Sequence, residues 1–251
     1  MSDQRAQFNA LHQSGCFVLP NPWDIGGARR LQKLGFKAIA SSSAAAAWTL
    51  GKADGELTLD EALDHLRLLC GAVDLPVNAD FEAGFADDPD GVARNVTLAV
   101  GTGVAGLSIE DRTGSELYAM ALAVERIRAA RAAIDATGEQ VVLVARTEGF
   151  LVGRTDLAST IERLTAFAEA GADCLYAPGV RALSDIRQIV EAVAPKPVNV
   201  LLTTTDAALA ELAEVGVRRV SVGGALAGRA WRAFDAAAEM LARDGRLPPI
   251  A

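Results

Sequence analysis

Residues 169–176 read EAGADCLY, and two other stretches follow the same plan: KLGFKAIA at 33–40 and EVGVRRVSV at 214–222. In each of them a helical pattern ends at a glycine, and a short apolar run begins three residues later. Glycine is preferred just past a helix end because it adopts positive φ without steric cost. The plan therefore predicts helices that turn directly into buried strands.

Short apolar runs of this kind alternate with longer helical patterns along the whole chain. Apolar runs without polar alternation are typical of strands that are covered on both faces, as in parallel sheets. The intervening patterns, such as 57–72 and 157–170, repeat their apolar residues at three- and four-residue spacing. The predicted strands are residues 16–19, 38–40, 77–80, 106–110, 141–146, 174–176, 198–201 and 219–222.

This alternation predicts an α/β fold in which residues 1–251 form a single (β/α)8 barrel, a TIM barrel, preceded by a helix over residues 2–13. That helix is placed to plug the bottom of the barrel. A doubly wound open sheet is the alternative, and it requires a glycine fingerprint after an early strand. Residues 21–30, NPWDIGGARR, do not match GxGxxG, which favours the barrel.

Composition excludes several classes of protein. The hydrophobic fraction of 51% is too high for a disordered chain. Because the formal net charge is −8, we expect neither nucleic acid nor an anionic membrane surface as a partner. No apolar run reaches the roughly 20 residues of a membrane span, and the polar N-terminus lacks a signal-peptide pattern, so we expect a cytoplasmic protein. With only two histidines and three scattered cysteines, chemistry must rest on carboxylates, arginine, a metal or the backbone.

Carboxylates gather where three neighbouring predicted strands end. The carboxyl ends of barrel strands meet at one face, where such folds place their active sites. Like charges crowded there repel one another unless a cation lies between them, and an all-oxygen donor set suits Mg²⁺. We expect Asp80 and Glu82 to point the same way on an extended strand, with Glu110 at the same height on the neighbouring strand. This predicted metal set is Asp80, Glu82 and Glu110.

Other functions for carboxylates in this region stay open. Some of them can cap the helices that follow, as Asp87 and Asp88 are expected to do ahead of Pro89. Asp111 can equally be the structural partner of an arginine. The metal hypothesis therefore concerns the set of three carboxylates and not every acidic residue at this face.

Arg146 ends an apolar strand, VVLVAR, where a buried guanidinium is costly unless it binds an anion. We expect it to clamp a substrate carboxylate, and the alternative is an internal ion pair with Glu148 or Glu110. The serines at 41–43 offer hydroxyl and N–H groups to a second anionic group, or they serve only the turn. Gly223-Gly224 precedes the last helix, where many barrels bind phosphate, so a phosphate-sugar isomerase is a further alternative.

Longer segments resemble the isocitrate lyase/phosphoenolpyruvate mutase superfamily, and the resemblance covers almost the whole chain. The matching segments include FVLPNPWDIGGARRL at 17–31, LPVNADFEAGFAD at 75–87, GLSIEDR at 106–112 and LVARTEGF at 143–150. The resemblance implies a (β/α)8 barrel that exchanges its eighth helix between paired subunits, as a homodimer or a homotetramer built as a dimer of dimers. It also implies Mg²⁺ and a small 2-oxo acid or dicarboxylate substrate, with cleavage of a C–C or C–P bond through an enolate.

Carried over residue by residue, the resemblance makes Asp80 the direct metal ligand. Glu82 stands in place of a second aspartate, and Glu110 is the glutamate of the IED motif; both would hold metal waters. Arg146 and Asp54, which lies in the mobile loop after the second strand, are the expected catalytic residues. Together with Asn199 at the end of the seventh strand, the expected substrate-binding residues are Trp23, Ser41, Ser42, Ser43, Asp80, Arg146 and Asn199.

The chain also departs from the family pattern. After the IED motif, residues 109–127 read IEDRTGSELYAMALAVERI and lack the cysteine and histidine of isocitrate and methylisocitrate lyases. Ala177 stands where those enzymes tend to have a glutamate. We therefore expect a Mg²⁺-dependent, oxaloacetate decarboxylase-like lyase, or an enzyme of phosphonopyruvate-like compounds, and not a true isocitrate or methylisocitrate lyase. The alternative is a binding protein for a 2-oxo acid, such as 2-oxoglutarate, with little or no lyase activity.

Overall fold

A sheet of parallel strands curls into a nearly closed barrel. The structure is a computed structural model that describes residues 2–202 and 207–249. Within these residues the strands of the barrel follow the order β1-β10-β9-β8-β7-β4-β3-β2. They are β1 (Phe17–Leu19), β2 (Ile39–Ala40), β3 (Val77–Asp80), β4 (Gly106–Glu110), β7 (Val142–Arg146), β8 (Cys174–Tyr176), β9 (Val198–Leu201) and β10 (Arg219–Ser221).

The sheet closes between its two edge strands through the chain that follows β1. The Ala40 N–H of β2 donates to the Pro20 carbonyl at 3.0 Å. A short antiparallel hairpin, β5 (Arg112–Thr113) with β6 (Glu116–Leu117), is added after β4. The predicted barrel is confirmed, and each predicted strand lies within a residue of the observed one.

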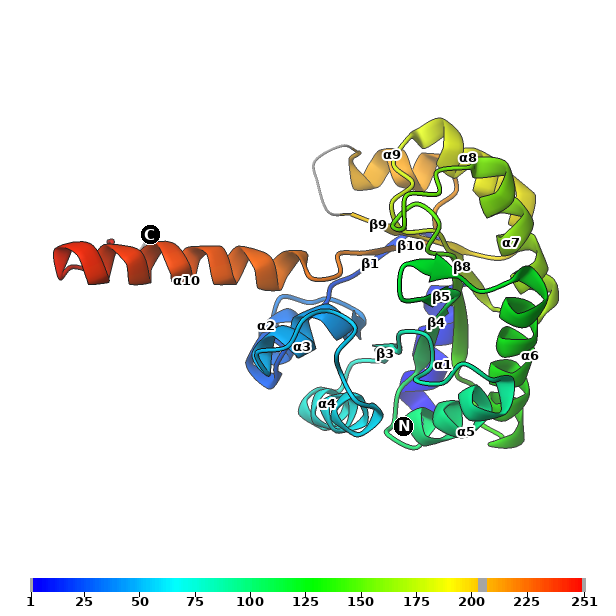
Figure 1. Ribbon diagram of the computed structural model, residues 1–251, viewed down its shortest axis with the longest axis horizontal. Coiled ribbons are helices and arrows are strands. Elements are labelled where there is room, and N and C mark those ends of the chain that lie inside the picture. Colours follow the sequence, from blue (N-terminus) through cyan, green and yellow to red (C-terminus); the bar gives the residue numbers. More distant parts are fainter. Residues whose placement is uncertain (1, 203–206, 250–251) are drawn as a thin grey trace.

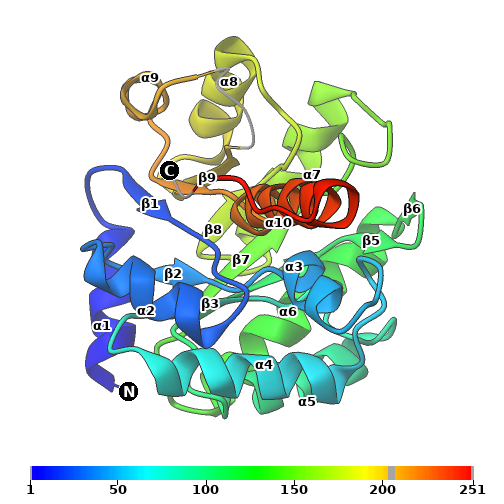
Figure 2. The same ribbon diagram turned by 90° about the vertical axis from the view of Figure 1, so that its left-hand side faces the viewer.

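Helices surround the barrel on its outside, as Figure 2 shows. Several begin at a side chain that accepts a backbone N–H, including Asp24, Thr58, Asp88 and Asp156. The glycines that end the helical patterns have positive φ, for example 104° at Gly171. The helices are α1 (Ser2–Leu11), α2 (Ile25–Lys33), α3 (Ser43–Thr49), α4 (Leu59–Ala72), α5 (Pro89–Val100), α6 (Met120–Ala136), α7 (Leu157–Glu169), α8 (Leu183–Val193), α9 (Leu209–Glu214) and α10 (Ala225–Asp244).

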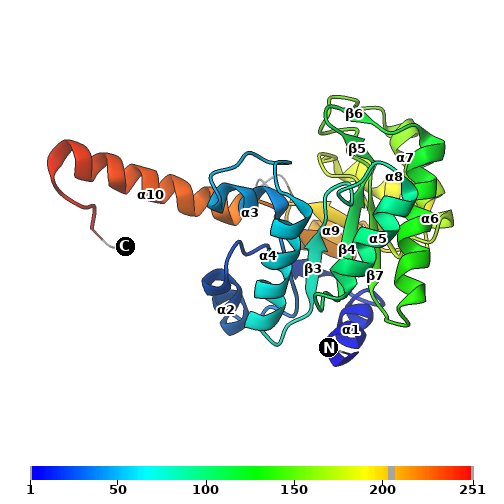
Figure 3. The ribbon, with the colours of Figure 1, turned by 60° about the horizontal axis from the view of Figure 1, so that its bottom comes forward.

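Helix α1 plugs the bottom of the barrel, as expected. Figure 3 shows α1 and the β5–β6 hairpin at opposite ends of the molecule. The Phe8 ring of α1 is fully buried and packs with strand residues such as Leu19 and Val142. Gly106 permits this approach, because a Cβ there would lie 2.6 Å from the Phe8 ring. The Arg5 guanidinium donates to the Val104 and Val100 carbonyls at 3.0 and 2.9 Å.

Helix α10 leaves the barrel and runs away from it (Figure 1). Of its 20 residues only Ala227 is buried, although the helix carries large apolar side chains. Trp231 is 38% exposed and Phe234 is 62% exposed, and their rings pack edge to face. Among the helices of the described residues, none combines the length and the apolar character needed to cross a bilayer.

The burial of Phe8 of α1 predicts that a substitution at this position destabilises the fold. Phe8→Ala should lower the free energy of unfolding by about 3–5 kcal/mol, because it opens a cavity beneath the strands. Urea denaturation followed by circular dichroism measures the change. Leu34→Ala, at a side chain that is 74% exposed, is the control and should change the stability little. Equal effects of the two substitutions would show that α1 is not part of the core.

Candidate functional site

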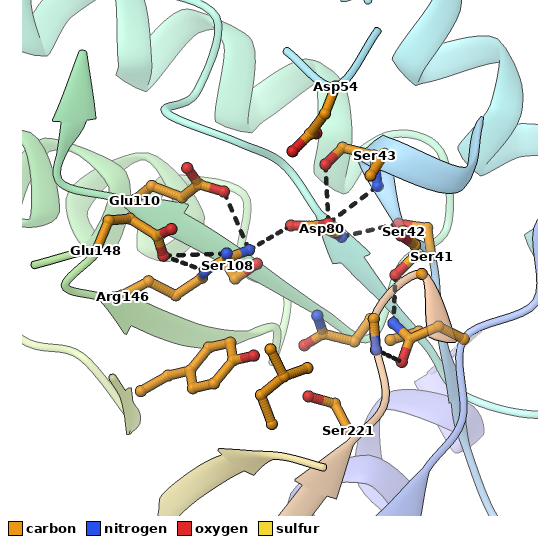
Figure 4. Close-up of a pocket in the computed structure, with 18 of the residues that line it drawn as sticks. Ser41, Ser42, Ser43, Asp54, Asp80, Ser108, Glu110, Arg146, Glu148 and Ser221 are labelled. Atoms are coloured by element: carbon orange, nitrogen blue, oxygen red, sulfur yellow. Dashed lines mark hydrogen bonds and ion pairs between the residues drawn. The ribbon is translucent and has the colours of Figure 1, made fainter. Parts of the chain in front are cut away.

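A cavity of about 180 Å³ opens where the barrel strands end (Figure 4). Its walls come from the segments after β2, β3, β4 and β7, which are far apart in the sequence. Arg146 of β7 and Tyr176 of β8 line it beside the predicted serines and carboxylates. The lining residues with polar side chains are Asn21, Ser41, Ser42, Ser43, Asp54, Asn78, Asp80, Ser108, Glu110, Arg112, Arg146, Glu148, Tyr176, Arg219 and Ser221.

The Arg146 guanidinium is the centre of this cavity and is shared by three carboxylates. Its Nη1 lies 2.6 Å from Asp80 Oδ1 and 3.1 Å from Glu110 Oε1. Both Nε and Nη2 lie 3.0 Å from Glu148 Oε1. The Tyr176 ring centroid is 5.1 Å from the guanidinium carbon. The internal ion pair that was the alternative for Arg146 is therefore present, and the clamp on a substrate carboxylate stays a prediction.

One positive charge is shared by two buried carboxylates, Glu110 and Glu148, and one partly buried carboxylate, Asp80, so the cluster has more negative than positive charge. Burial opposes the charge on Arg146, but Glu110, Glu148 and Asp80 outweigh burial and hold the pKa of Arg146 well above its ordinary value. Burial raises the pKa of Glu110 to about 8 despite the attraction of Arg146, and Glu148 and Asp80 add to the rise. Burial also raises the pKa of Glu148. The cluster therefore carries an excess of negative charge that a further cation or a proton would balance.

The serine segment after β2 orients Asp80. Ser43 donates both its backbone N–H and its hydroxyl to Asp80 Oδ2, each at 2.9 Å. The Asp80 N–H donates to Ser41 Oγ at 2.8 Å. Ser42 caps α3, where its Oγ accepts from the Ala45 N–H at 3.3 Å. All three predicted serines line the cavity, and each has a structural contact as well.

The expectation that Asp80 and Glu82 point the same way is wrong. Strand β3 ends at Asp80, and Glu82 has a φ of 46°, in the left-handed region, so the extended alternation stops between them. Asp80 pairs across the sheet with Ser108, whereas the Glu110 N–H donates to the Glu82 carbonyl at 2.9 Å. Glu110 therefore lies level with Glu82 and not with Asp80.

Glu82 faces a second hollow, of about 560 Å³, which adjoins the cavity. Asp54, Glu110 and Arg112 line both spaces, and Tyr118 lines the second one. Glu82 Oε1 is buried and has no hydrogen-bond partner in the described residues. An unpaired buried carboxylate oxygen is costly, and this orphaned oxygen is the feature of the site that favours a bound cation.

The part of the chain that the structure describes holds no preformed group of three or more His, Cys, Asp or Glu side chains around one point. Mg²⁺ does not require one, because it usually keeps several waters and takes one or two carboxylates. Such a hydrated ion fits three features of the site. They are the unpaired Glu82 oxygen, the excess of negative charge around Arg146 and the donor set that consists only of oxygens. Asp80, Glu82 and Glu110 remain the side chains that would hold such an ion, in part through its waters.

Sequence reasoning missed a clamp that shapes the segment after β3. Arg126 of α6 is only 1% exposed and donates to the Ala86 and Asp87 carbonyls at 2.5 and 2.6 Å and to the Ala83 carbonyl. Its guanidinium lies 4.1 Å from the centroid of the Tyr118 ring. The only sequence signal was an arginine on a helix face that is otherwise rich in alanine and isoleucine. The clamp fixes the turn that redirects Glu82.

The predicted helix caps at Asp87 and Asp88 separate in the structure. Asp88 caps α5 and accepts from the Gly91 N–H at 2.8 Å, as expected. Asp87 does not cap the helix; its carboxylate accepts from the Tyr118 hydroxyl at 2.5 Å. Two adjacent carboxylates cannot both occupy one N-cap position. Because Asp88 occupies it, the Asp87 carboxylate bonds to Tyr118 instead, beside the Arg126 clamp.

Asp111 serves as the structural partner of an arginine, which was one of its two expected roles. Its Oδ2 lies 3.0 Å from Arg163 Nη1, and its Oδ1 accepts from the Glu148 N–H at 2.9 Å. It therefore positions Glu148 under Arg146 and does not face the cavity itself.

Asn21 and Arg219 also line the cavity, and neither was predicted as a site residue. Asn21 joins three strand ends: its Nδ2 donates to the Ser41 carbonyl at 2.6 Å, and its Oδ1 accepts from the Val222 and Gly223 N–H groups. Arg219 of β10 is 2% exposed and donates to the side-chain oxygens of Asn199 and Asn78 at 2.9 and 3.1 Å. Because β1 and β2 form no ladder, Asn21 completes the barrel closure at this end.

Two predicted substrate-binding residues lie outside the cavity. Asn199 is 1% exposed, and both ends of its amide are engaged, by Arg219 and by Ser221 Oγ at 3.0 Å. Trp23 lines a separate apolar hollow between α2, α3 and α4, because Asp24 caps α2 and turns the chain there. The structure therefore does not bring either residue together with Arg146.

Known proteins resemble this chain over most of its length. A family model described as phosphoenolpyruvate phosphomutase matches residues 8–242. The 2-methylisocitrate lyase of Escherichia coli (strain K12) is 35% identical over 204 residues, which are 73% of this chain and 68% of that enzyme. The oxaloacetate decarboxylase of Pseudomonas paraeruginosa is 33% identical over 199 residues, which are 74% of this chain and 67% of that enzyme.

Solved structures share the fold over nearly the whole chain. A Burkholderia cenocepacia protein that is provisionally assigned as a lyase/mutase has 46% identity and a TM-score of 0.95, over 98% of this chain and 91% of its own. An oxaloacetate acetylhydrolase in complex with oxalate has 26% identity and a TM-score of 0.89, over 98% of this chain and 89% of its own. The family model, the relatives and the barrel agree, and the chain belongs to the phosphoenolpyruvate mutase/isocitrate lyase superfamily of lyases and mutases.

Proposed function

We propose that the protein is a Mg²⁺-dependent lyase that decarboxylates oxaloacetate or a closely similar 2-oxo acid. The observation that carries the proposal is the cluster around Arg146: a guanidinium held in place by Asp80, Glu110 and Glu148 at the wall of a small cavity. Relatives that act on oxaloacetate, the decarboxylase and the acetylhydrolase, support this choice of substrate.

The reaction breaks the bond between C3 and C4 of the substrate. The electron pair of that bond passes into the 2-oxo group, carbon dioxide leaves, and the enolate of pyruvate remains. Catalysis then depends on groups that stabilise the negative charge of the enolate more than they stabilise the substrate. When bound, Mg²⁺ supplies Lewis-acid chemistry, since it favours negative charge on an oxygen beside it.

The residues around the cavity supply the remaining functions. Arg146 provides a fixed positive charge that costs no reorganisation during the reaction. The Ser41 and Ser42 hydroxyls each accept an internal hydrogen bond, so each keeps its own proton to donate to a substrate carboxylate. Asp54, in the exposed segment between α3 and α4, lines both hollows, and we assign to it the delivery of a proton to C3 of the enolate.

Two features make decarboxylation the preferred reaction over cleavage of isocitrate-type substrates. The short β5–β6 hairpin follows the IED motif in place of a loop with cysteine and histidine. Ala177 is buried in the apolar core and contributes no acid or base. Loss of carbon dioxide requires neither a general acid to protonate the leaving group nor a further catalytic carboxylate at position 177. The absence of these groups therefore does not impede it.

The second candidate function is the binding of a 2-oxo acid with little turnover. The observation that favours it is that Arg146 and Asp80 are already engaged with other side chains of the chain. Calorimetric titration with pyruvate, oxalate and 2-oxoglutarate, combined with turnover assays, separates the two. Tight binding of a 2-oxo acid without turnover of any member of the panel supports this second function.

We also propose that α10 packs against a second copy of the chain, in a dimer or a dimer of dimers. The helix exposes Trp231 and Phe234, which its own barrel does not cover. The apolar hollow between α2, α3 and α4, of about 680 Å³, offers a surface of matching character. Burying both would remove an exposed apolar patch of the kind that marks interfaces.

The proposed reaction predicts that the purified protein produces pyruvate from oxaloacetate in the presence of Mg²⁺ and stops when a chelator is added. Asp80→Asn and Arg146→Lys should each lower kcat/KM by about 100-fold or more, because each removes a contact at the site of developing charge. A coupled lactate dehydrogenase assay measures pyruvate. Asp60→Asn, at an exposed position of α4, is the control and should keep full activity. Equal rates for Asp80→Asn and the wild type would contradict the assignment.

The surroundings of Glu82 predict how stability changes with pH. Burial first, and then Asp80 and Asp54, raise the pKa of Glu82 from 4.5 to about 7. The folded protein therefore keeps a proton on Glu82 at pH values at which the unfolded chain has lost it. This contribution to stability is fully present below pH 4.5 and is lost as the pH rises through about 7.

Glu82→Gln should remove that loss. Between pH 5 and pH 8, the wild type should lose stability relative to Glu82→Gln in urea unfolding experiments that contain a chelator. Glu169→Gln, at an exposed position at the end of α7, should follow the wild type at every pH. A difference between wild type and Glu82→Gln that does not change with pH would show that Glu82 is ionised throughout.

The proposed assembly predicts that the wild type has the mass of a dimer or a tetramer in light scattering after size exclusion. Trp231→Glu combined with Phe234→Glu should shift the mass towards the monomer, because charges replace the exposed apolar pair. The far-ultraviolet circular dichroism of the double variant should stay that of a folded barrel. A monomeric wild type at micromolar concentration would refute the assembly.

A further inference from the structure

Three arginines line the cavity within the described residues, and they differ in what already holds them. Arg146 is surrounded by three carboxylates at 2.6–3.1 Å. Arg219 is 2% exposed and is held between two asparagine side chains. The nearest carboxylate to Arg112 is that of Glu110, with Nε at 3.7 Å from Oε2, and no hydrogen bond of its guanidinium is found among the described residues. Arg112 therefore has the most donor capacity to offer an incoming anion.

The backbone of Arg112 is also held in position by its neighbours. It is the first residue of β5 and pairs with Leu117 of β6. The residue before it is anchored on both sides: the Asp111 N–H donates to the Arg146 carbonyl at 3.1 Å, and the Tyr118 N–H donates to the Asp111 carbonyl at 2.8 Å. The backbone of Arg112 is therefore tied to β7, while its side chain, 31% exposed, reaches the junction of the cavity and the second hollow.

The two guanidiniums flank a single carboxylate. Glu110 Oε1 lies 3.1 Å from Arg146 Nη1, and Glu110 Oε2 lies 3.7 Å from Arg112 Nε. Arg112 and Arg146 are thus separated by about the width of one carboxylate and its contacts. That separation suits a short molecule with an anionic group at each end, because one end can lie near Arg146 and the other near Arg112.

We propose that Arg112 is a specificity-determining residue that binds the distal carboxylate of the substrate. The protein then selects 2-oxo dicarboxylates over 2-oxo monocarboxylates of the same chain length. This inference rests on the proposed function, since it requires that the cavity bind the 2-oxo acid end of the substrate.

The proposal has a kinetic signature. The distal carboxylate of oxaloacetate becomes neutral carbon dioxide, so its attraction to Arg112 is strongest in the bound substrate and fades as the bond breaks. An interaction of this kind stabilises the bound substrate more than the transition state, so its removal should raise KM and kcat together and leave kcat/KM nearly unchanged. A residue that only supports the fold would lower kcat or the stability of the protein.

The test compares oxaloacetate with 2-oxobutanoate, which has the same four carbons and lacks the distal carboxylate. Dissociation constants are measured calorimetrically at low temperature with Mg²⁺ present, for the wild type, Arg112→Gln and Arg112→Lys. The wild type should bind oxaloacetate at least about 10-fold more tightly than 2-oxobutanoate. Arg112→Gln should weaken oxaloacetate binding by about 10- to 100-fold and leave 2-oxobutanoate within about twofold. Arg112→Lys should recover part of the loss.

Steady-state kinetics give the second measurement. For oxaloacetate, Arg112→Gln should raise KM by a similar factor without lowering kcat, so that kcat/KM falls by much less than KM rises. Equal weakening of both acids, or of neither, would overturn the role of Arg112 while leaving the proposed function intact. If the wild type binds neither acid, the proposed function fails and the inference fails with it.

Discussion

One guanidinium shared by three carboxylates, two of them buried and one partly buried, determines how the site is arranged. Arg146 joins the ends of β3, β4 and β7 through Asp80, Glu110 and Glu148. A buried ion pair of this kind gains little stability, because desolvation offsets the attraction. Its value is positional: each carboxylate has one geometry in which it reaches Arg146, so the strand ends are held in register at the mouth of the barrel. The excess of negative charge also leaves the site receptive to a cation.

The surrounding chain supports this cluster with side chains that lie outside the cavity or do not contact Arg146. Ser43 holds Asp80, and Asp111, itself paired with Arg163, holds the backbone of Glu148. Arg126 clamps the turn after β3 and so directs Glu82 to the second hollow. The geometry of the cluster is thereby set from several elements at once.

Much of the fold could be predicted because its signals are local. The glycines after several helical patterns, the apolar runs and the absence of a nucleotide fingerprint were sufficient to predict the barrel, and the position of the strand ends brought Asp80, Glu110 and Arg146 to one face. The direction of Glu82 could not be predicted, because a left-handed residue after β3 breaks the alternation and no glycine marks it. Trp23 and Asn199 were predicted at the carboxyl end of the barrel. Both lie outside the cavity, because the direction of their side chains depends on the cap of α2 and on Arg219.

From the amino-acid sequence alone one can predict the succession of strands and helices, the family and the residues that meet at the carboxyl face. These features depend on the order of residues along the chain, through hydrophobic period, caps and motif spacing. The folded structure is needed to see which charges are paired, which oxygen is left without a partner and which arginine keeps unused donors. Those properties depend on distances between residues as far apart as Asp80 and Arg146, and on the loss of solvent around them.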